Sequence, residues 1–274
     1  MKQLAGNTSV SIQPLTAKDL EHVTPLQPEG WGDILPSIQY YCASDFCYPL
    51  KATVDGALVG IGTAIVHGKT AWLAHIVVHK DYRNKGIGTI VTNSLIDLVN
   101  TNSCKTILLL ATTLGEPVYR KFGFQVEAQY LFFDHGTLPP AESSPHIVEY
   151  HQKYEDIIFK LDYNVSGEDR KRLLKEHSAE TKLFVEHGEL IGFYAATLGE
   201  GLIVAENCDA GFALMKLKFA NNTNFCLPEN NEAGINFLTR HGFKVYRKAS
   251  RMILGENIVW DGKKVYSRIG GNLG

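Results

Sequence analysis

The segment 73–99 constrains the fold most, because an apolar strand, a glycine-containing basic loop and a helix follow one another without a break. Apolar and β-branched residues dominate 70–78 and predict a strand. The loop reads Arg83-Asn-Lys-Gly-Ile-Gly88, and apolar residues recur at helical spacing behind it. A helix N-terminus presents unpaired N–H groups to anions, and glycine lets the backbone approach them closely. The segment therefore predicts a phosphate-binding loop, with an ordinary glycine turn as the alternative.

The strands before this loop decide between the known kinds of phosphate loop. Residues 50–54 and 57–66 read as strands around an Asp55-Gly56 turn, and a second turn at 67–69 leads into the strand at 70–78. Rossmann and P-loop sites need Gly-x-Gly-x-x-Gly or Gly-Lys-Ser/Thr, and both belong to parallel sheets. This loop has neither pattern and follows an antiparallel meander. We therefore expect a pyrophosphate site on a mixed sheet.

The remaining elements of the first half follow from periodicity and caps. Thr16 and Asp19 form a capping box at a helix start. The other expected elements are a strand at 10–14, a helix within 33–43, a strand at 106–111, a short helix at 115–121 and a strand at 125–133.

The second half begins after a proline-rich linker at 137–145. Helices are predicted at 149–161 and 168–177, the second capped by Ser166. The basic run Arg170, Lys171 and Arg172 is interpreted as a solvated helix face.

Two short segments of the second half repeat segments of the first. The turn and strand start at 55–60 resemble 187–192, and Phe122-Gly-Phe124 resembles His241-Gly-Phe243. Coincidence is the alternative, but the order and the type of element agree. A repeat of this length predicts a duplicated domain, with domains at 1–138 and 139–274.

The first half resembles the GNAT superfamily of N-acetyltransferases. The strand and loop from His75 to Gly88 are similar to the family's acyl-CoA signature, and Tyr119-Arg-Lys-Phe-Gly-Phe124 is similar to its second motif. The resemblance is specific over 50–133 and implies an α+β fold with a mixed sheet. It further implies a GNAT-like N-terminal domain and a second, degenerate GNAT-like C-terminal domain, as in tandem members.

The resemblance implies acetyl-CoA as the cofactor and assigns roles to residues. The backbone of the strand end would pair with the pantetheine arm, the loop would wrap the pyrophosphate, and Thr112 would stand where many members carry Asn. Tyr119 would be the general acid that protonates the departing thiolate. The implied cofactor-binding residues are Ile76, Val77, Val78, Arg83, Asn84, Lys85, Gly86, Ile87, Gly88, Thr89 and Thr112.

No carboxylate stands out as a general base. His75 is a catalytic candidate, because an imidazole can accept a proton through water near neutral pH; a packed strand histidine is the alternative. The aromatic residues Trp31, Tyr40, Tyr41 and Phe46 have two interpretations as well. They line an acceptor pocket, or they anchor helices on the sheet.

The second half lacks the catalytic features. Alignment of Phe124 with Phe243 places Leu238 opposite Tyr119 and Asn231 opposite Thr112, and no basic glycine loop precedes them. We therefore expect this half to be a packing, closing or dimerising domain without a cofactor.

The sequence thus predicts an N-acetyltransferase that uses a small-molecule or peptide amine as acceptor, with a non-catalytic CoA-binding or metabolite-sensing module as the alternative. The formal charge of −2 gives no basis for nucleic-acid binding. Five cysteines without a Cys-x-x-Cys pair argue against disulfides and a zinc ribbon. No apolar run approaches 18 residues, so we expect no membrane span and a cytoplasmic protein. No metal site is predicted, and a homodimer is left open.

Overall fold

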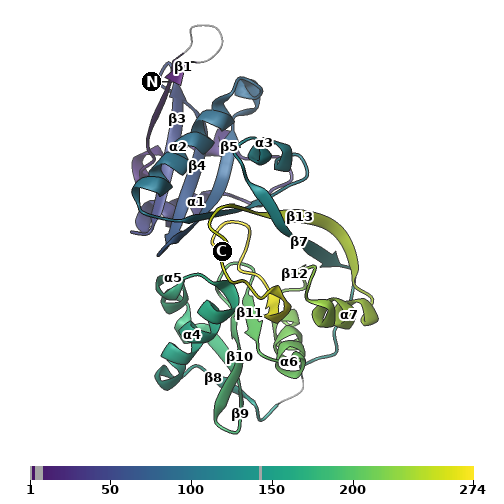
Figure 1. The fold of residues 1–274 in the computed structure, drawn as a ribbon. Helices are drawn as coiled ribbons and strands as arrows, with labels where there is room; N and C mark the ends of the chain where they lie inside the picture. The colour runs from purple at the N-terminus through teal and green to yellow at the C-terminus, as the bar shows by residue number, and fades with distance from the viewer. Residues whose placement is uncertain (1, 4–8, 142–143) are drawn as a thin grey trace. The chain divides into compact units, whose positions relative to one another are not determined.

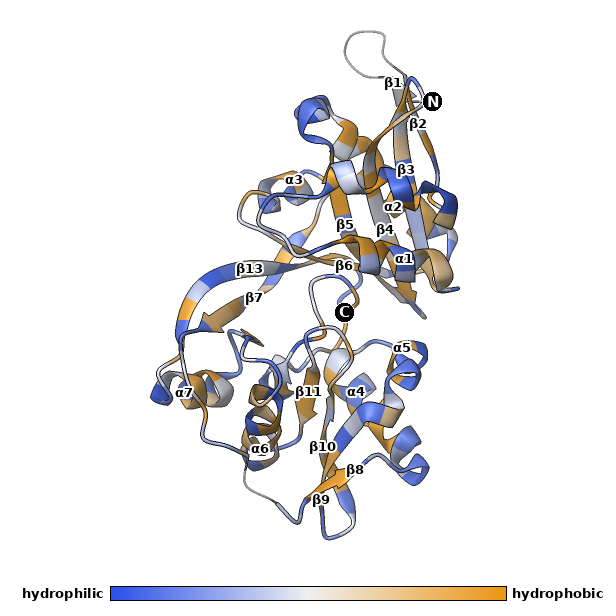
Figure 2. Cartoon of the chain, turned by 180° about the vertical axis from the view of Figure 1, so that it is seen from behind, coloured by the Kyte–Doolittle hydropathy of each residue, from blue (hydrophilic) through white to orange (hydrophobic). Residues whose placement is uncertain are grey.

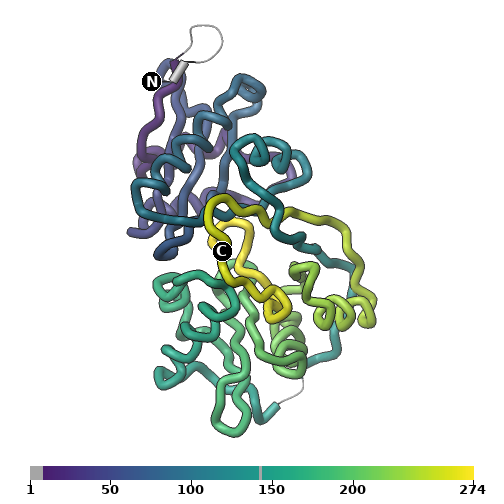
Figure 3. Tube along the Cα trace, in the orientation of Figure 1, coloured from purple at the N-terminus to yellow at the C-terminus, as the bar shows by residue number. Residues whose placement is uncertain are grey.

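The computed structural model describes residues 2–3, 9–141 and 144–274, and the chain forms two compact units, Met1–Leu109 and Leu110–Gly274. Both units combine sheets with helices and are traced in Figure 1 and Figure 3. The mixed α/β fold with two related halves confirms the expected fold class. The domain boundary after residue 138 stays a prediction.

A sheet of antiparallel strands forms the body of the first unit. Its last pair alone is parallel, between β5 and β6. The strands lie in the order of the chain: β1 (Lys2–Gln3), β2 (Ser9–Pro14), β3 (Cys47–Val54), β4 (Ala57–His67), β5 (Thr70–Val78) and β6 (Thr106–Ala111). The bounds of β5 and β6 are those predicted from the sequence.

Helix α2 (Ile87–Thr101) packs against this sheet. Its buried face includes Val91 and Leu95, which lie so close to Gly62 of β4 that a side chain there would clash with them. Helix α1 (Leu35–Ala43) contacts β3. Mostly apolar residues line the strands beneath both helices (Figure 2). The predicted capping box is present at a 3-10 helix, η1 (Ala17–His22), where the Thr16 N–H donates to Asp19 Oδ2 at 2.8 Å.

A five-stranded sheet forms part of the second unit. Its strands lie in the order β14 (Val265–Ser267), β11 (Leu202–Ala205), β10 (Glu189–Ala195), β9 (Thr181–Glu186) and β8 (Ile147–Glu149). Helices α4 (Glu155–Ser166) and α6 (Cys208–Phe219) both contact β10 and β11.

Strand β7 (Gln125–Asp134) lies between two strands that come much later in the chain. It pairs antiparallel with β12 (Phe225–Pro228) on one side and with β13 (Lys244–Gly255) on the other. The short helix α3 (Glu116–Arg120) precedes β7, and α7 (Glu232–Arg240) precedes β13. A strand encoded before the linker is therefore the centre of a group whose other members come after it.

Two expected helices of the second half were placed wrongly. The segment predicted as a helix at 149–161 begins with the end of β8, and α4 starts only at Glu155. The second helix, α5 (Lys171–Glu176), is shorter than 168–177, and Ser166 ends α4 instead of capping α5. Gly167 in the left-handed conformation (φ 73°) terminates α4, a stop signal that the periodicity did not show.

The basic run at 170–172 is not a uniformly solvated face. Arg170 is 6% exposed, and its guanidinium binds the buried Asp162 carboxylate through Nε and Nη2. A buried arginine needs such a partner, because an unpaired charge inside the protein is strongly unfavourable.

The duplication is confirmed in backbone geometry. Asp55-Gly56 and His187-Gly188 both turn with positive φ at the two central residues, as in a type I′ hairpin. The helix ends agree too, because Phe124 N–H donates to the Tyr119 carbonyl and Phe243 N–H donates to the Leu238 carbonyl. Leu238 is thus the counterpart of Tyr119.

Part of the predicted linker, residues 142–143, and residues 4–8 near the start lie outside the described residues. The five cysteines carry free thiols. None of the helices in the described part of the chain combines the length and the apolar character needed to cross a bilayer.

Candidate active site

The glycine loop of the first unit leads into an uncapped helix N-terminus. After a single 3-10 turn, η3 (Lys80–Tyr82), Asn84 and Gly86 both take positive φ, 60° and 82°. Gly86 is the N-cap of α2, and no side chain caps the helix. The first N–H groups of any helix lack intrahelical acceptors, so this loop offers several donors to an anion.

The side chains around these donors are exposed and basic. Arg83 folds back so that its Nε donates to the Val78 carbonyl at 3.2 Å, and Lys85 Nζ lies 5.0 Å from the Tyr82 ring centre. Ile87 is 1% exposed and anchors the start of α2. The loop therefore combines a helix start that is fixed in place with two exposed basic side chains, Arg83 and Lys85, that can turn toward a phosphate.

Strand β5 has an open edge next to this loop. Its pairing with β6 ends at Trp72 and Leu108, and among the described strands of the first unit no other lies on that side of residues 73–78. On its other side, Val77 and Val78 pair with Ile61 and Gly60 of β4. The free backbone groups of this edge can bind an extended amide chain in the manner of an added strand.

His75 lies at an irregularity in the same strand. The register between β4 and β5 shifts between Ile61 and Thr63, and His75 has a φ of 46°, which is uncommon for a residue with a side chain. Its Nδ1 lies 2.9 Å from the Tyr41 hydroxyl. Burial lowers the pKa of His75 to about 4, so the imidazole is neutral near pH 7.

Tyr119 and Thr112 belong to the second unit. Tyr119 lies in α3 with its ring edge-on to Phe124, 6.0 Å between centroids, and burial raises the pKa of its phenol to about 12. Among the described residues its hydroxyl has no hydrogen-bond partner. The hydroxyl therefore keeps its proton at neutral pH and is free to donate it.

Glu116 fixes the short helix that carries Tyr119. Its carboxylate accepts hydrogen bonds from Arg120 and from Ser250 of β13. Thr112 holds the turn that leads into the same helix, since its Oγ1 accepts the N–H of Gly115, the N-cap residue, at 3.2 Å. The hydroxyl of Thr112 thus has a structural role that its position in the sequence did not reveal.

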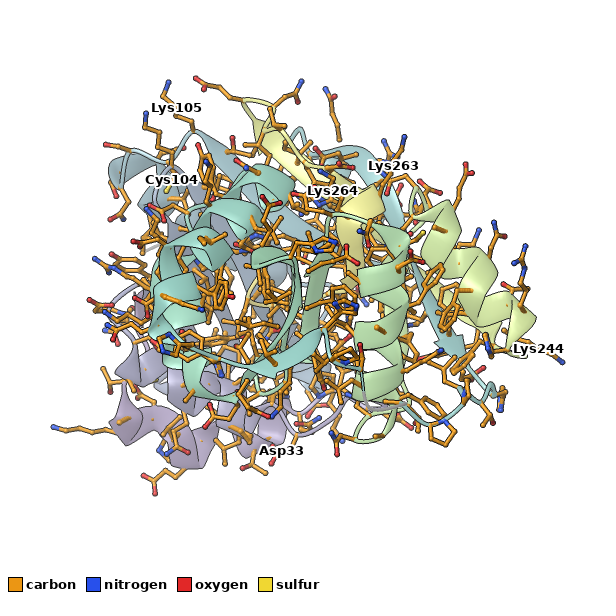
Figure 4. All side chains as sticks on the ribbon, turned by 90° about the horizontal axis from the view of Figure 1, so that it is seen from below. Asp33, Cys104, Lys105, Lys244, Lys263 and Lys264 are labelled. Atoms are coloured by element: carbon orange, nitrogen blue, oxygen red, sulfur yellow. The ribbon has the colours of Figure 1, made fainter. Side chains whose placement is uncertain are left out.

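The corresponding helix start in the second half is closed to anions. Asn207 caps α6, its side chain accepting the Ala210 N–H at 2.9 Å, and Glu206 and Asp209 place negative charge beside the first turn. Lys264, labelled with Lys263 in Figure 4, binds Glu206 at 2.6 Å. A capped and acidic helix start does not attract a pyrophosphate.

The structure groups the sequence-predicted residues in two sets. The first set lies in the first unit and consists of residues 75–78 at the end of β5, namely His75, Ile76, Val77 and Val78, together with the loop from Arg83 to Thr89 that follows. The second set, Thr112 and Tyr119, lies in the second unit. Sequence reasoning missed the contact between Tyr41 and His75. The two residues are 34 positions apart, and nothing in their spacing indicates it.

Two family models match the chain. The model described as acetyltransferase (GNAT) family matches residues 18–124, and the model described as acetyltransferase (GNAT) domain matches residues 158–267. The second match covers the half that has no glycine loop, in agreement with the repeated turns and helix ends.

Comparisons with individual proteins agree with this fold. The uncharacterized protein YyaT of Bacillus subtilis (strain 168) is 32% identical over 88 residues, 32% of this chain and 60% of that protein, so the match spans less than two thirds of its length. A candidate acetyltransferase from Pyrococcus horikoshii is 23% identical, with a TM-score of 0.82 over 97% of this chain and 96% of that one. A GCN5-related N-acetyltransferase from Anabaena variabilis is 9% identical, with a TM-score of 0.59 over 89% and 72%. At these identities the two structures show the fold alone.

Proposed function

The chain belongs to the GNAT family of acetyltransferases, with two domains of that family, and on this premise we propose that it transfers an acetyl group from acetyl-CoA to a primary amine. The uncapped start of α2 beside the open edge of β5 carries the proposal. An anion site that directly follows an open strand edge along the chain fits CoA, because the pyrophosphate of CoA continues into the amide-containing pantetheine arm.

The residues of the first unit fit the two parts of CoA. The N–H groups from Gly86 to Thr89, with Arg83 and Lys85 nearby, would hold the pyrophosphate. The free backbone groups of Ile76 to Val78 would bind the pantetheine amides. The Val78 carbonyl already accepts from Arg83, so that side chain would have to move as the arm binds.

Acetyl-CoA supplies an activated acyl group: the amine nitrogen forms the new C–N bond as the C–S bond breaks. Tyr119 would give its proton to the departing sulfur, and its raised pKa keeps that proton in place until the thiolate forms. His75 is a weak base at a pKa of about 4, which suits an amine that arrives neutral and loses its proton to water. Backbone N–H groups near Val77 and Val78 would stabilise charge on the carbonyl oxygen.

The second half would support the first without binding CoA. Leu238 replaces the proton donor, and the capped, acidic start of α6 replaces the anion site. We assign the catalytic domain to 1–138 and the degenerate domain to 139–274, although β7 pairs with strands of the later part.

The test measures CoA formation by chromatography, because the exposed thiol of Cys208 would react in a thiol-dye assay. The protein is given acetyl-CoA and a panel of primary amines, and CoA affinity is measured by calorimetry. Gly86→Asp should weaken CoA binding more than about tenfold, since it adds a side chain at positive φ and a negative charge beside the phosphates.

Gly56→Asp is the matched control. Gly56 also has a φ of 82°, and a side chain there meets open space, so this variant shares the backbone strain but lies in the turn between β3 and β4, outside the loop. Equal CoA affinity of the two variants would refute the assigned loop. CoA binding without turnover on any amine would instead indicate a binding module.

A further inference from the structure

Two aromatic rings of the first unit, those of Tyr41 and Trp31, lie against His75. Tyr41 of α1 is 1% exposed, with its ring centre 5.5 Å from the imidazole. Trp31, just before α1, is 47% exposed and stands edge-on to the imidazole, with centroids 6.2 Å apart. The imidazole therefore lies next to a buried phenol and next to an indole that is accessible to solvent.

The backbone at His75 is held in an unfavourable conformation by its surroundings. The positive φ of 46° coincides with the register shift opposite Gly62, and Gly62 has no room for a side chain because Val91 and Leu95 of α2 pack onto it. Such strain persists only where the fold enforces it, and it concentrates at functional sites. The backbone irregularity at His75 thus lies opposite a position of β4 that α2 covers.

The hydrogen bond to Tyr41 selects the tautomer of His75. A phenol is a much better donor than acceptor, and a neutral imidazole nitrogen is a strong acceptor, so Tyr41 donates to Nδ1. The ring proton of a neutral imidazole then resides on Nε2. Burial keeps the ring neutral, in agreement with the lowered pKa. His75 therefore presents a fixed N–H donor.

The proposed function places this donor near the reacting carbon, and the inference rests on that function. With the pyrophosphate on the loop after Val78, the pantetheine arm would run back along β5. Extended, it is roughly four residues long, or about 14 Å. Counted back from Val78, this length ends close to His75.

We propose that Trp31 and His75 form the acceptor subsite, in which the indole packs against an aromatic group of the amine and Nε2–H donates to a carbonyl next to it. The chemical class is an aromatic α-amino amide, such as an aromatic amino acid amide or a peptide that begins with an aromatic residue. His75 is then a substrate-binding residue, and Tyr41 is a positioning residue that acts through it.

Four amines separate the two contacts: phenylalaninamide carries ring and carbonyl, phenethylamine only the ring, alaninamide only the carbonyl, and ethylamine neither. The wild-type protein should use phenylalaninamide best, with kcat/KM at least about tenfold lower when either group is missing. Trp31→Ala should remove the preference for the ring and keep the preference for the carbonyl. Tyr163→Ala, at a 54% exposed aromatic of the second unit, is the control and should change neither.

His75→Met and His75→Gln form a matched pair, because both side chains are unbranched but only Gln has an N–H donor. The Met variant should lose the carbonyl preference, through KM more than kcat, and the Gln variant should retain part of it. Nitrogen NMR of His75 should show the proton on Nε2, and Tyr41→Phe should shift this tautomer balance.

A proton on Nδ1, or variants that lower kcat/KM equally for all four amines, would overturn the subsite. Turnover by the wild-type protein without preference among the amines would contradict this inference alone. Absence of CoA release with every amine, phenylalaninamide included, would contradict the proposed function together with it.

Discussion

Thr112 and Asn231 perform the same task in the two halves of the chain: the side chain of each accepts the backbone N–H three residues later, from Gly115 at 3.2 Å and from Gly234 at 2.8 Å. Asn231 is buried, and its Nδ2 also donates to the Val265 carbonyl at 2.9 Å. The alignment of Thr112 with Asn231 thus has a structural basis in the same local hydrogen bond. Asn231 is the N-cap of α7, whereas Thr112 holds the turn just before α3, whose N-cap is Gly115.

Removal of the two side-chain acceptors should have unequal effects on stability. Thr112→Ala should lower the free energy of unfolding by about 1 kcal/mol, the usual effect of one lost hydrogen bond. Asn231→Ala should cost about 2–3 kcal/mol, because it also leaves the buried Val265 carbonyl without this donor. Urea denaturation measures both, with the exposed neighbour Thr113→Ala as control. Equal losses at the two positions would contradict the assigned contacts.

Tyr119→Phe should reduce kcat by roughly 10²–10⁴ while acetyl-CoA affinity changes little, because the ring and its contact with Phe124 remain. Steady-state kinetics with an accepted amine and calorimetry with CoA give the two values. Tyr163→Phe, on an exposed position of α4, is the control.

The same phenol determines what the pH profile should look like. With a pKa of about 12, Tyr119 stays protonated throughout the usual assay range, so loss of its proton should produce no fall in rate below about pH 10. A fall that occurs near neutral pH in the wild-type protein and disappears in Tyr119→Phe would contradict this assignment.

His75 should make the fold sensitive to acid. Its pKa is about 4 in the folded protein and about 6.5 in an unfolded chain. Above pH 6.5 both states are neutral and the residue has no effect. As the pH falls from 6.5 to 4, the unfolded state binds a proton that the folded state does not, and stability drops by up to about 3 kcal/mol.

Urea denaturation at a series of pH values tests this effect. His75→Gln should lose less stability than the wild-type protein between pH 6.5 and 4. His22→Gln, at an exposed position in η1, should behave like the wild-type protein. If the free energy of unfolding fell equally with pH in all three proteins, His75 would bind a proton as readily in the folded protein as in the unfolded chain, contrary to its lowered pKa.

The boundary predicted after residue 138 should not yield an autonomous C-terminal fragment. A fragment of residues 139–274 lacks β7 and so leaves β12 and β13 without the strand that pairs with both. We expect it to unfold without cooperativity, whereas a fragment of residues 110–274 should show a cooperative transition. Circular dichroism during thermal unfolding compares them. A sharp transition in the shorter fragment would mean that β7 is dispensable.

The local sequence pattern predicted most strands and helices of the first half correctly. The strands at 70–78 and 106–111 were found because apolar runs end at turn residues, and the start of α2 because helical spacing begins behind the glycines. The role of that loop in phosphate binding stays a prediction. The helices after the linker were misplaced because Glu149 belongs to a strand and Gly167 ends α4. The burial of Arg170 depends on Asp162 of the neighbouring helix, and the surroundings of His75 depend on Tyr41, 34 positions earlier in the chain. These contacts are set by packing, which periodicity does not report.

The position of β7 also bears on how the chain folds as it leaves the ribosome. Gln129 of β7 bonds Ser250 of β13, and these residues are 121 positions apart. Because synthesis runs from the N-terminus, β7 emerges with both edges bare and with Phe132 and Phe133 uncovered until its partners have been made. The last step of folding therefore waits for nearly the whole polypeptide. During that interval β7 is the segment most exposed to aggregation, and slower translation of the second half would prolong the risk.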